Sequence, residues 1–277
     1  MSDNEMISIS VITVCYNAQN TIGKTIESIL SQSYENIEFI LVDGASTDNT
    51  LNVAKEYLAK KVKIKTYVLS EPDKGIYNAM NKGVTLSSGN YCVFMNAGDT
   101  FYAKDTIKNA VQEFENENYD ILVGKSFNQH GIQSPLNKSC LSLFMIYKYG
   151  FCHQAAFIKR NLLIKYPYDE CFRIASDSKF FLEVLIQNKA TYKDIQTIVC
   201  NYAPGGISSN KTLHDDELNT CIYQLFGERI ATDILLLDKF YNPLLRALLP
   251  LSESRLFKSF IFPVTKKVFH VIISSRI

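Results

Sequence analysis

Carboxylates that could bind a metal ion or a ligand stand at the ends of two apolar runs. Residues 91–95 (YCVFM) end at the cluster 96–99 (NAGD), and residues 37–42 (IEFILV) end at Asp43. A short continuous apolar run is typical of a strand that is buried on both faces of a parallel sheet. Open α/β sheets bind ligands beyond the carboxyl ends of their strands, where Asp43 and Asp99 would lie. A polar turn after each strand is the simpler interpretation of either cluster alone.

A third polar cluster follows the first predicted strand, at residues 7–15 (ISISVITVC), and begins with Tyr16 and Asn17. Its β-branched residues favour a central strand. In a parallel sheet the three clusters lie at one edge. Acidic groups there suit a ligand that binds together with cations, or a ligand whose heterocyclic base has N–H donors. The sequence has neither G-x-G-x-x-G after the first strand nor G-x-x-x-x-G-K-[ST], which argues against a dinucleotide dehydrogenase and a P-loop kinase.

The second half of the chain contains fewer residues of this kind. His153 and Gln154 precede an apolar run, and Asp177 stands at the start of an amphipathic helix. Taken alone, His153 is more simply a buried histidine with satisfied hydrogen bonds, and Asp177 is as simply a helix cap. Residues 204–208 (PGGIS) predict a turn that can approach a ligand closely.

Strands and helices alternate along the part of the chain that must position these residues. Strands are predicted at 7–15, 37–42, 62–69, 91–95, 119–124 and 191–202. Helices are predicted between them, the first capped by Asn20 or Thr21 and the second by Ser46 or Thr47. This alternation indicates an α/β fold with a mostly parallel central sheet, right-handed crossovers and flanking helices.

Composition argues against several other classes of protein. The chain has 277 residues, 47% of them hydrophobic, and a formal net charge of +1, which does not favour a nucleic-acid binder. Its seven cysteines have no C-x-x-C spacing and fit buried thiols in a reducing cytosol. The polar, acidic N-terminus is unlike a signal peptide, and no apolar run is long enough to predict a membrane-spanning helix.

The composition changes near Lys239. Residues 239–277 contain seven basic side chains and one acidic side chain, interleaved with leucine, isoleucine, valine and phenylalanine. This pattern predicts helices that lie on an anionic membrane surface. The alternative is a helical cap packed on the domain, with its lysines and arginines in solvent. We therefore expect a ligand-binding domain over residues 1–230 and a basic amphipathic segment over residues 231–277.

These pieces resemble a known family. Residues 10–50 (SVITVCYNAQNTIGKTIESILSQSYENIEFILVDGASTDNT) resemble the opening of a family 2 glycosyltransferase with the GT-A fold. The resemblance covers residues 7–125, extends less closely over 151–210, and is greatest to the subgroup that makes bacterial O-antigen and capsule polysaccharide. It implies inverting transfer of a hexose from a nucleotide-sugar, here expected to be a UDP-sugar, to a lipid-linked glycan. The enzyme would work in the cytoplasm, on the inner face of the membrane.

The resemblance also implies roles for individual residues on the donor side. The nucleotide pocket would be lined by Thr13, Cys15, Tyr16 and Asn17. Asp43 would accept the N–H of the uracil ring, and Asp73 would lie in the donor-side loop before a helix that starts near Gly75.

The remaining implied roles concern the metal and the acceptor. Residues 96–99, with Asn96 and Gly98, match the metal motif, and Asp99 would be the direct ligand of Mn²⁺ or Mg²⁺. Asp177 matches the catalytic base. The donor phosphates or the acceptor would be bordered by His153, Gln154, Gly206 and Ser208.

The chain departs from the family pattern in its acidic residues. The family often has acidic residues where Gly44, Asn96 and Gly98 stand, so the metal motif retains one strong carboxylate. One can suffice, because such ions keep waters and borrow substrate phosphates. A nucleotidyltransferase on a similar sheet is the first alternative, but residues 16–20 contain no basic side chain for a triphosphate. A catalytically silent scaffold that binds partners through residues 239–277 is the second.

Overall fold

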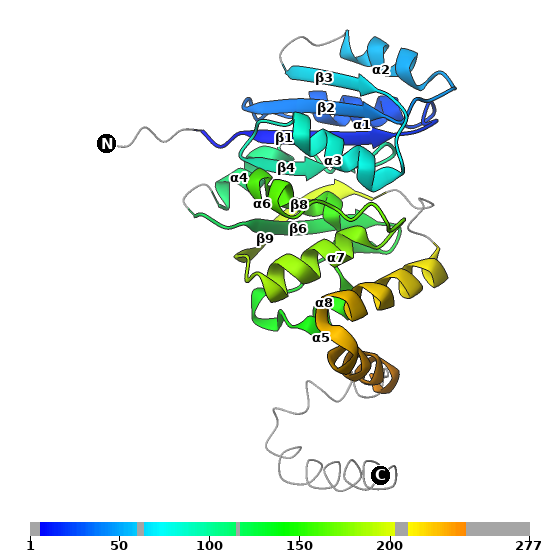
Figure 1. Cartoon of the computed structure of the whole chain (residues 1–277). Coiled ribbons are helices and arrows are strands. Elements are labelled where there is room, and N and C mark those ends of the chain that lie inside the picture. The colour runs from blue at the N-terminus through cyan, green and yellow to red at the C-terminus, as the bar shows by residue number, and fades with distance from the viewer. Residues whose placement is uncertain (1–5, 60–63, 115–116, 203–209, 242–277) are drawn as a thin grey trace, which may run out of the picture. The chain divides into compact units, whose positions relative to one another are not determined.

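The computed structural model describes residues 6–59, 64–114, 117–202 and 210–241 (Figure 1). The chain divides into two compact units, Met1–Leu225 and Phe226–Ile277. Gly206, Ser208 and most of the predicted membrane segment lie outside the described residues. The residues discussed below as a candidate site all belong to the first unit.

Nine strands form one sheet in the described part of the chain, in the order β3-β2-β1-β4-β8-β6-β9-β5, with β7 paired to β6. Their bounds are β1 Ile9–Cys15, β2 Ile37–Asp43, β3 Lys65–Ser70, β4 Tyr91–Phe94, β5 Thr100–Phe101, β6 Ile121–Asn128, β7 Gly131–Gln133, β8 Ala156–Lys159 and β9 Tyr192–Asn201. The six predicted strands all have counterparts here, although the strand predicted from residue 62 begins at Lys65.

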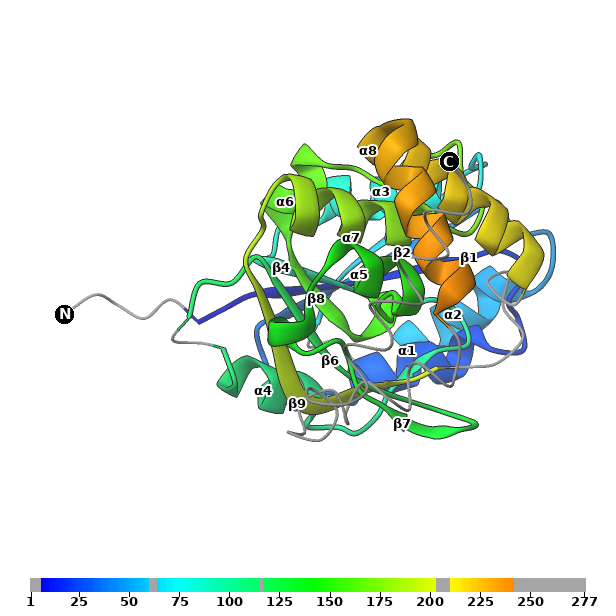
Figure 2. The ribbon, with the colours of Figure 1, turned by 90° about the horizontal axis from the view of Figure 1, so that it is seen from below.

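Helices cover both faces of this sheet. Their bounds are α1 Ile22–Leu30, α2 Thr50–Leu58, α3 Ile76–Leu86, α4 Thr106–Gln112, α5 Leu143–Tyr149, α6 Arg160–Lys165, α7 Ser176–Leu182 and α8 Lys211–Phe240. There are also two 3₁₀ turns, η1 Lys138–Cys140 and η2 His153–Ala155, and a π-helical segment, η3 Glu183–Gln187, that directly follows α7. Figures 1 and 2 show α3, α6 and α7 on one face and α1 and α4 on the other. The helical range of α8 is interrupted at Gly227, where φ is 74°.

The first four strands in the order are parallel, as predicted. β1 pairs in parallel with β2 and β4, and β2 pairs in parallel with β3. Every residue of β1 and β2 is buried, which explains their nearly continuous apolar sequences. β3 is the edge strand, and its side chains are at least partly exposed. The carboxyl ends of β1, β2 and β4 therefore meet at one edge.

The second half of the sheet departs from simple alternation. β8 pairs antiparallel with both β4 and β6, while β6 and β9 are parallel with irregular register. This reversal places η2, which directly precedes β8, next to β4 and β6. The turn that contains His153 is thus brought to the end of β4.

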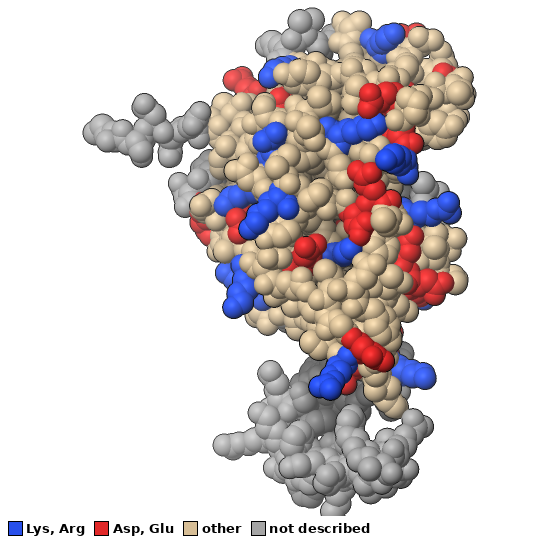
Figure 3. All heavy atoms as spheres, in the orientation of Figure 1, with Lys and Arg blue, Asp and Glu red and all other residues tan. Residues whose placement is uncertain are grey.

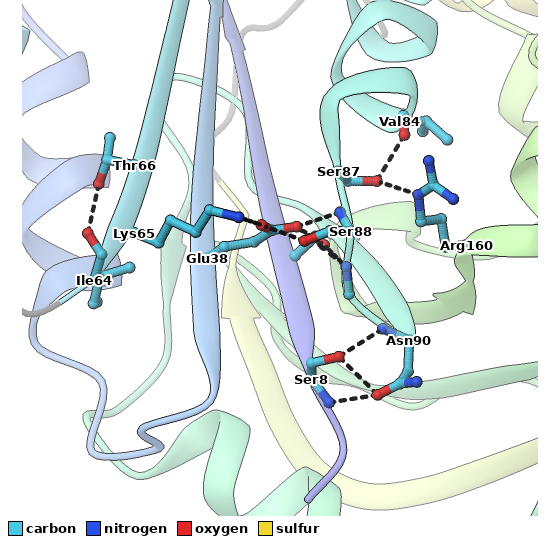
Figure 4. Close-up of polar contacts among 12 residues, drawn as sticks. Ser8, Glu38, Ile64, Lys65, Thr66, Val84, Ser87, Ser88, Asn90 and Arg160 are labelled. Carbon is cyan, nitrogen blue, oxygen red and sulfur yellow. Dashed lines mark hydrogen bonds and ion pairs between the residues drawn. The ribbon is translucent and has the colours of Figure 1, made fainter. Parts of the chain in front are cut away.

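A buried carboxylate secures the other end of the parallel strands (Figure 4). Glu38 of β2 accepts hydrogen bonds from Ser10 Oγ (2.7 Å), from Ser88 Oγ (2.8 Å) and from the Gly89 amide (3.1 Å). A Cβ on Gly89 would lie 2.9 Å from the Ser10 backbone nitrogen, so glycine is needed there. This cluster fixes the start of β4 beside β1 and β2, and with it the position of residues 96–99.

Lysine, arginine and acidic side chains are intermixed over the face in Figure 3, and acidic groups gather along one side of it. Four of the described cysteines are buried, but Cys171 is exposed, so the prediction of buried thiols is wrong at that position. None of the described helices has the length and apolar character needed to cross a membrane.

Candidate active site

Asp43, the last residue of β2, is fully buried and heavily hydrogen-bonded. Its carboxylate accepts from the Ser46 amide (3.0 Å), the Ser46 hydroxyl, the Ser70 hydroxyl (2.7 Å) and the Cys15 thiol (3.6 Å). Burial, and then the neighbouring Asp43 carboxylate, raise the pKa of the Cys15 thiol, which keeps it protonated as a donor. The thiol is the weakest of these donors.

The prediction that Ser46 or Thr47 caps the second helix is wrong. α2 begins at Thr50 after Asn49, and the Ser46 side chain instead holds Asp43. The neighbouring Asn17 has a left-handed φ of 49°, and its side chain accepts a hydrogen bond from the Thr47 amide (2.9 Å). The loops after β1 and β2 are thereby joined into one surface at the sheet edge.

Tyr16, Gly44 and Asp73 meet on that surface. Tyr16 is 63% exposed, whereas Asp73 is half-buried. A Cβ on Gly44 would lie 2.4 Å from Asp73 Oδ2 and 3.5 Å from Tyr16 Cδ2. An acidic side chain at position 44, common in the family that the sequence resembles, would clash with a second carboxylate here.

Thr13 lies behind this surface. Its side chain is fully buried and donates a hydrogen bond to the Met95 carbonyl (2.7 Å). Cys15 is also buried, with its thiol against Asp43. Both side chains therefore make contacts inside the protein, at the carboxyl end of β1, and their predicted place in the nucleotide pocket stays a prediction.

Residues 96–99 form a tight turn after β4. Gly98 has a φ of 111°, which favours glycine, and its amide donates to Thr25 Oγ1 (3.0 Å). The Asp99 side chain is 6% exposed, and its Oδ2 accepts from Gln154 Nε2 (3.1 Å). Asn96 Oδ1 is buried without a hydrogen-bond partner in the described structure. A carboxylate and an unsatisfied amide oxygen in one turn suit a hard divalent cation.

Asp177 is held by three different elements. Its Oδ2 lies 2.9 Å from His153 Nδ1 of η2, and its Oδ1 accepts from Tyr77 Oη of α3 (3.0 Å) and from the Ser178 amide (2.9 Å). The helix α7 starts at Ser176 with Ala175 as its N-cap, so the interpretation of Asp177 as a plain cap accounts for only one of these contacts. Both Asp177 and His153 retain a side-chain exposure of 15%, which leaves them within reach of a ligand.

The two charges shift each other's ionisation. Burial alone raises the pKa of Asp177, but the hydrogen bond and charge of His153 outweigh it and leave this pKa below its ordinary value. Burial alone lowers the pKa of His153, but Asp177 outweighs it and the net shift is upward. Asp177 is therefore ionised near neutral pH and its orientation is fixed by the imidazole ring.

The predicted metal motif and the predicted base are connected. Asn96 Nδ2 lies 3.4 Å from His153 Nε2, on the ring nitrogen opposite the one that faces Asp177. Gln154, the next residue, bonds Asp99. The short turn η2 thus links both carboxylates. Sequence reasoning missed Tyr77, because nothing in the local helical pattern distinguishes it from its apolar neighbours.

A cavity of about 610 Å³ opens beside this cluster. Its lining includes His153, Gln154 and Asp177 and extends to residues of β6, α5 and the start of α8. Among the described residues that line it, Asp177 is the one acidic side chain, and the basic ones besides His153 are Lys148, Lys211 and His214. The cavity therefore suits a ligand that has a hydroxyl for Asp177 and negatively charged groups for the basic side chains.

Comparison with known proteins identifies the family. The model of the family described as Glycosyl transferase family 2 matches residues 10–159, more than half of the chain. The chain belongs to glycosyltransferase family 2. It is 29% identical over 215 residues to a PGL/p-HBAD biosynthesis glycosyltransferase of Mycobacterium tuberculosis, a match that covers 75% of this chain and 81% of the relative. The putative glycosyltransferase EpsE of Bacillus subtilis is 43% identical over 97 residues, 35% of this chain and 32% of EpsE.

Solved structures show that this family 2 enzyme has the GT-A fold. TarS of S. aureus superposes with a TM-score of 0.61 at 20% identity, over 83% of this chain and 42% of TarS. A TarS fragment, residues 1–349, in complex with UDP-GlcNAc gives 0.60 at 19% identity, over 92% and 76% of the two chains. The mannosyltransferase PcManGT of Pyrobaculum calidifontis, in complex with GDP-Man and Mn²⁺, gives 0.58 at 17% identity, over 92% and 83%.

Proposed function

We propose that this glycosyltransferase inverts the anomeric carbon of a UDP-hexose and transfers the sugar to a lipid-linked glycan, in the synthesis of a cell-surface polysaccharide. One observation carries the proposal. An ionised carboxylate, Asp177, is aimed by His153 and Tyr77 into a cavity, and the same turn that holds it also bonds Asp99. A base for an acceptor hydroxyl and a carboxylate for the donor side thus stand together.

We assign the donor to the surface at the ends of β1 and β2. Tyr16 and Asn17 would flank the nucleotide, and Asp43 would accept the uracil N–H in place of the weak Cys15 bond. Asp73 lies close enough to Gly44 to border the same ligand. Solved relatives of this fold bind UDP-GlcNAc, or GDP-Man with Mn²⁺, which supports a nucleotide-sugar as the donor.

A divalent cation, Mn²⁺ or Mg²⁺, fits the turn after β4. Asp99 and the unsatisfied Asn96 Oδ1 would hold it, with Gln154 keeping the carboxylate in place. The described residues contain no group of three or more His, Cys, Asp and Glu that could hold a metal by itself. The donor phosphates would therefore provide some of the ligands of the ion. When bound, the ion would stabilise the negative charge of the leaving diphosphate.

The residues of the chain then act on the acceptor. Asp177 takes the proton of the attacking hydroxyl as the new bond to the sugar forms on the face opposite the leaving group, which inverts its configuration. His153 and Tyr77 hold the carboxylate in position for this transfer. No nucleophilic side chain is needed in a single displacement.

Two features support a lipid-linked acceptor. The cavity is also lined by Lys148, Lys211 and His214, which suit the phosphate groups of a lipid-linked glycan. The sequence of residues 231–277 fits a segment that holds a catalytic domain, residues 1–230, on an anionic membrane. We propose that the enzyme acts in the cytoplasm on the inner face of the membrane.

A donor screen tests this function. Purified enzyme with Mn²⁺ is heated in the presence of UDP-, GDP- and dTDP-sugars, with the Asp99→Asn variant as a matched control. A UDP-sugar at about 100 times its dissociation constant should add about 2.7 kcal/mol to the free energy of unfolding. The proposal is wrong if none of the nucleotide-sugars stabilises the enzyme and none is hydrolysed by it. That result would favour a catalytically silent scaffold.

A further inference from the structure

A carboxylate from α8 holds the loop that precedes Asp177. Glu217 Oε1 accepts a hydrogen bond from the Arg173 amide (2.9 Å), and its Oε2 accepts from the amides of Ile174 (2.9 Å) and Ala175 (3.0 Å). The last of these residues stands two positions before Asp177. Three consecutive N–H groups aimed at one carboxylate form an anion-binding concavity, filled here by a side chain 42 to 44 residues further along the chain.

This contact is set within buried structure. Ile174 is 5% exposed and Ala175 is fully buried, so their N–H groups have little access to water. Hydrogen bonds to an ionised carboxylate are stronger than neutral ones, and leaving buried donors unsatisfied is costly. The Glu217 carboxylate therefore fixes the backbone from which the base projects.

The side chain and the main chain of the base are thus held from different directions. Tyr77 and His153 fix the carboxylate of Asp177, whereas Glu217 fixes the backbone before it. The same turns of α8 also contribute Lys211 and His214 to the cavity wall. α8 therefore joins the wall of the cavity to the loop of the base.

We propose that Glu217 is a positioning residue for the transfer reaction. Its carboxylate sets the place of Asp177 relative to the cavity, so that an acceptor hydroxyl meets a correctly aimed base. This inference rests on the proposed function, in which Asp177 is that base. A residue that only capped the loop would affect folding stability without a specific effect on the proton-transfer step.

The test uses Glu217→Gln and Glu217→Ala in the full-length enzyme. The glutamine amide keeps one acceptor oxygen, so it retains up to two of the three bonds, whereas alanine retains none. Because a misplacement of about 1 Å can cost about 100-fold in rate, we expect kcat to fall about tenfold in the first variant and about 100-fold in the second. The donor KM and UDP binding should not change. Asp216→Asn, an exposed neighbour, is the control and should match the wild type.

A double-mutant cycle separates positioning from stability. With Asp177→Asn as the background, Glu217→Ala should change the residual rate by less than about twofold, because the group that it positions is already inactive. An equal loss of rate in both backgrounds, or a loss of donor binding that matches the loss of kcat, would overturn the proposal. If Glu217→Ala does not fold, Glu217→Gln is used in the same cycle. Full turnover by Asp177→Asn alone would instead refute the role of Asp177 as the base, and the positioning role with it, whereas failure of the donor screen would refute the proposed function.

Discussion

Replacing Asp177 by asparagine separates catalysis from structure at the proposed base. The carboxylate accepts three hydrogen bonds, from His153, Tyr77 and the Ser178 amide. The amide oxygen of the Asp177→Asn variant can still accept from Tyr77 and Ser178. Its NH₂ group can donate to His153 once the ring adopts the neutral tautomer with an unprotonated Nδ1. The variant therefore keeps the three hydrogen bonds at this position and loses the charge, while the His153 ring nitrogen that faces Asn96 becomes protonated.

The expected magnitudes follow from these contacts. All three bonds to the ionised carboxylate become neutral, but the cost of burying its charge is removed as well, so we expect a net loss of about 1 kcal/mol of stability and a Tm lower by about 2–4 °C for a domain of this size. An amide cannot take the acceptor proton, so transfer should fall at least about 100-fold, or about 2.7 kcal/mol in activation free energy. The loss of rate should thus greatly exceed the loss of stability.

The assay measures release of the nucleoside diphosphate, with calorimetry of UDP and a thermal melt on the same preparations. Asp169→Asn is a matched control. Asp169 forms an ion pair with Lys179, which lies on α7, and it does not line the large cavity. It should retain its rate. Full turnover by Asp177→Asn would refute the reasoning. A variant that loses rate only because it unfolds would be recognised by a Tm shift far above the expected one.

The remaining predictions concern the donor site, the C-terminal segment and the strand ends. In calorimetry with UDP, Asp43→Ala should weaken binding by about 1–3 kcal/mol with or without Mn²⁺. Asp99→Asn should remove only the part of the UDP affinity that depends on the metal. Unchanged UDP binding in both variants would exclude this donor site. Truncation after Asp238 should abolish sedimentation of the enzyme with anionic liposomes, and high salt should release part of the full-length protein from them. Equal sedimentation of the truncated and full-length proteins would show that the C-terminal segment does not anchor the enzyme. For Glu38, burial raises the pKa but the hydrogen bonds of Ser10, Ser88 and Gly89 outweigh it and the net shift is downward. The stabilising contribution of the Glu38 carboxylate is therefore complete above the unfolded pKa of about 4.3 and is lost as the pH falls through the folded pKa. The difference in Tm between the wild type and Glu38→Gln should therefore shrink from neutral pH to about pH 3. A difference that stays constant over this range would contradict this.

The sequence predicted the parts of the fold that depend on local patterns. The apolar runs of β1, β2 and β4 and the polar clusters at their ends are each contained within a few residues, so the shared sheet edge followed from them. The place of Asp99 after β4 and of Asp177 at the start of α7 was predicted in the same way.

What could not be predicted depends on contacts between distant segments. Tyr77 meets Asp177 across 100 residues, and Glu217 meets the loop before α7 across more than 40. The reversal at β8 and the role of Ser46 depend on which segments lie side by side, and a single sequence does not encode that in any local pattern. The hydrogen bond of Thr13 to the Met95 carbonyl was not predictable either, because a hydroxyl in a strand can equally face a ligand or bond a neighbouring segment.

The stereochemistry of the transferred sugar tests the central claim most directly. The enzyme with Mn²⁺ is given the UDP-sugar selected in the donor screen, with water or a lipid-linked glycan as the acceptor, and the first product is followed by NMR before mutarotation. A single displacement assisted by Asp177 predicts that an α-linked donor yields a β product, at a rate at least about 100-fold lower in Asp177→Asn. A product that retains the donor configuration would contradict this mechanism.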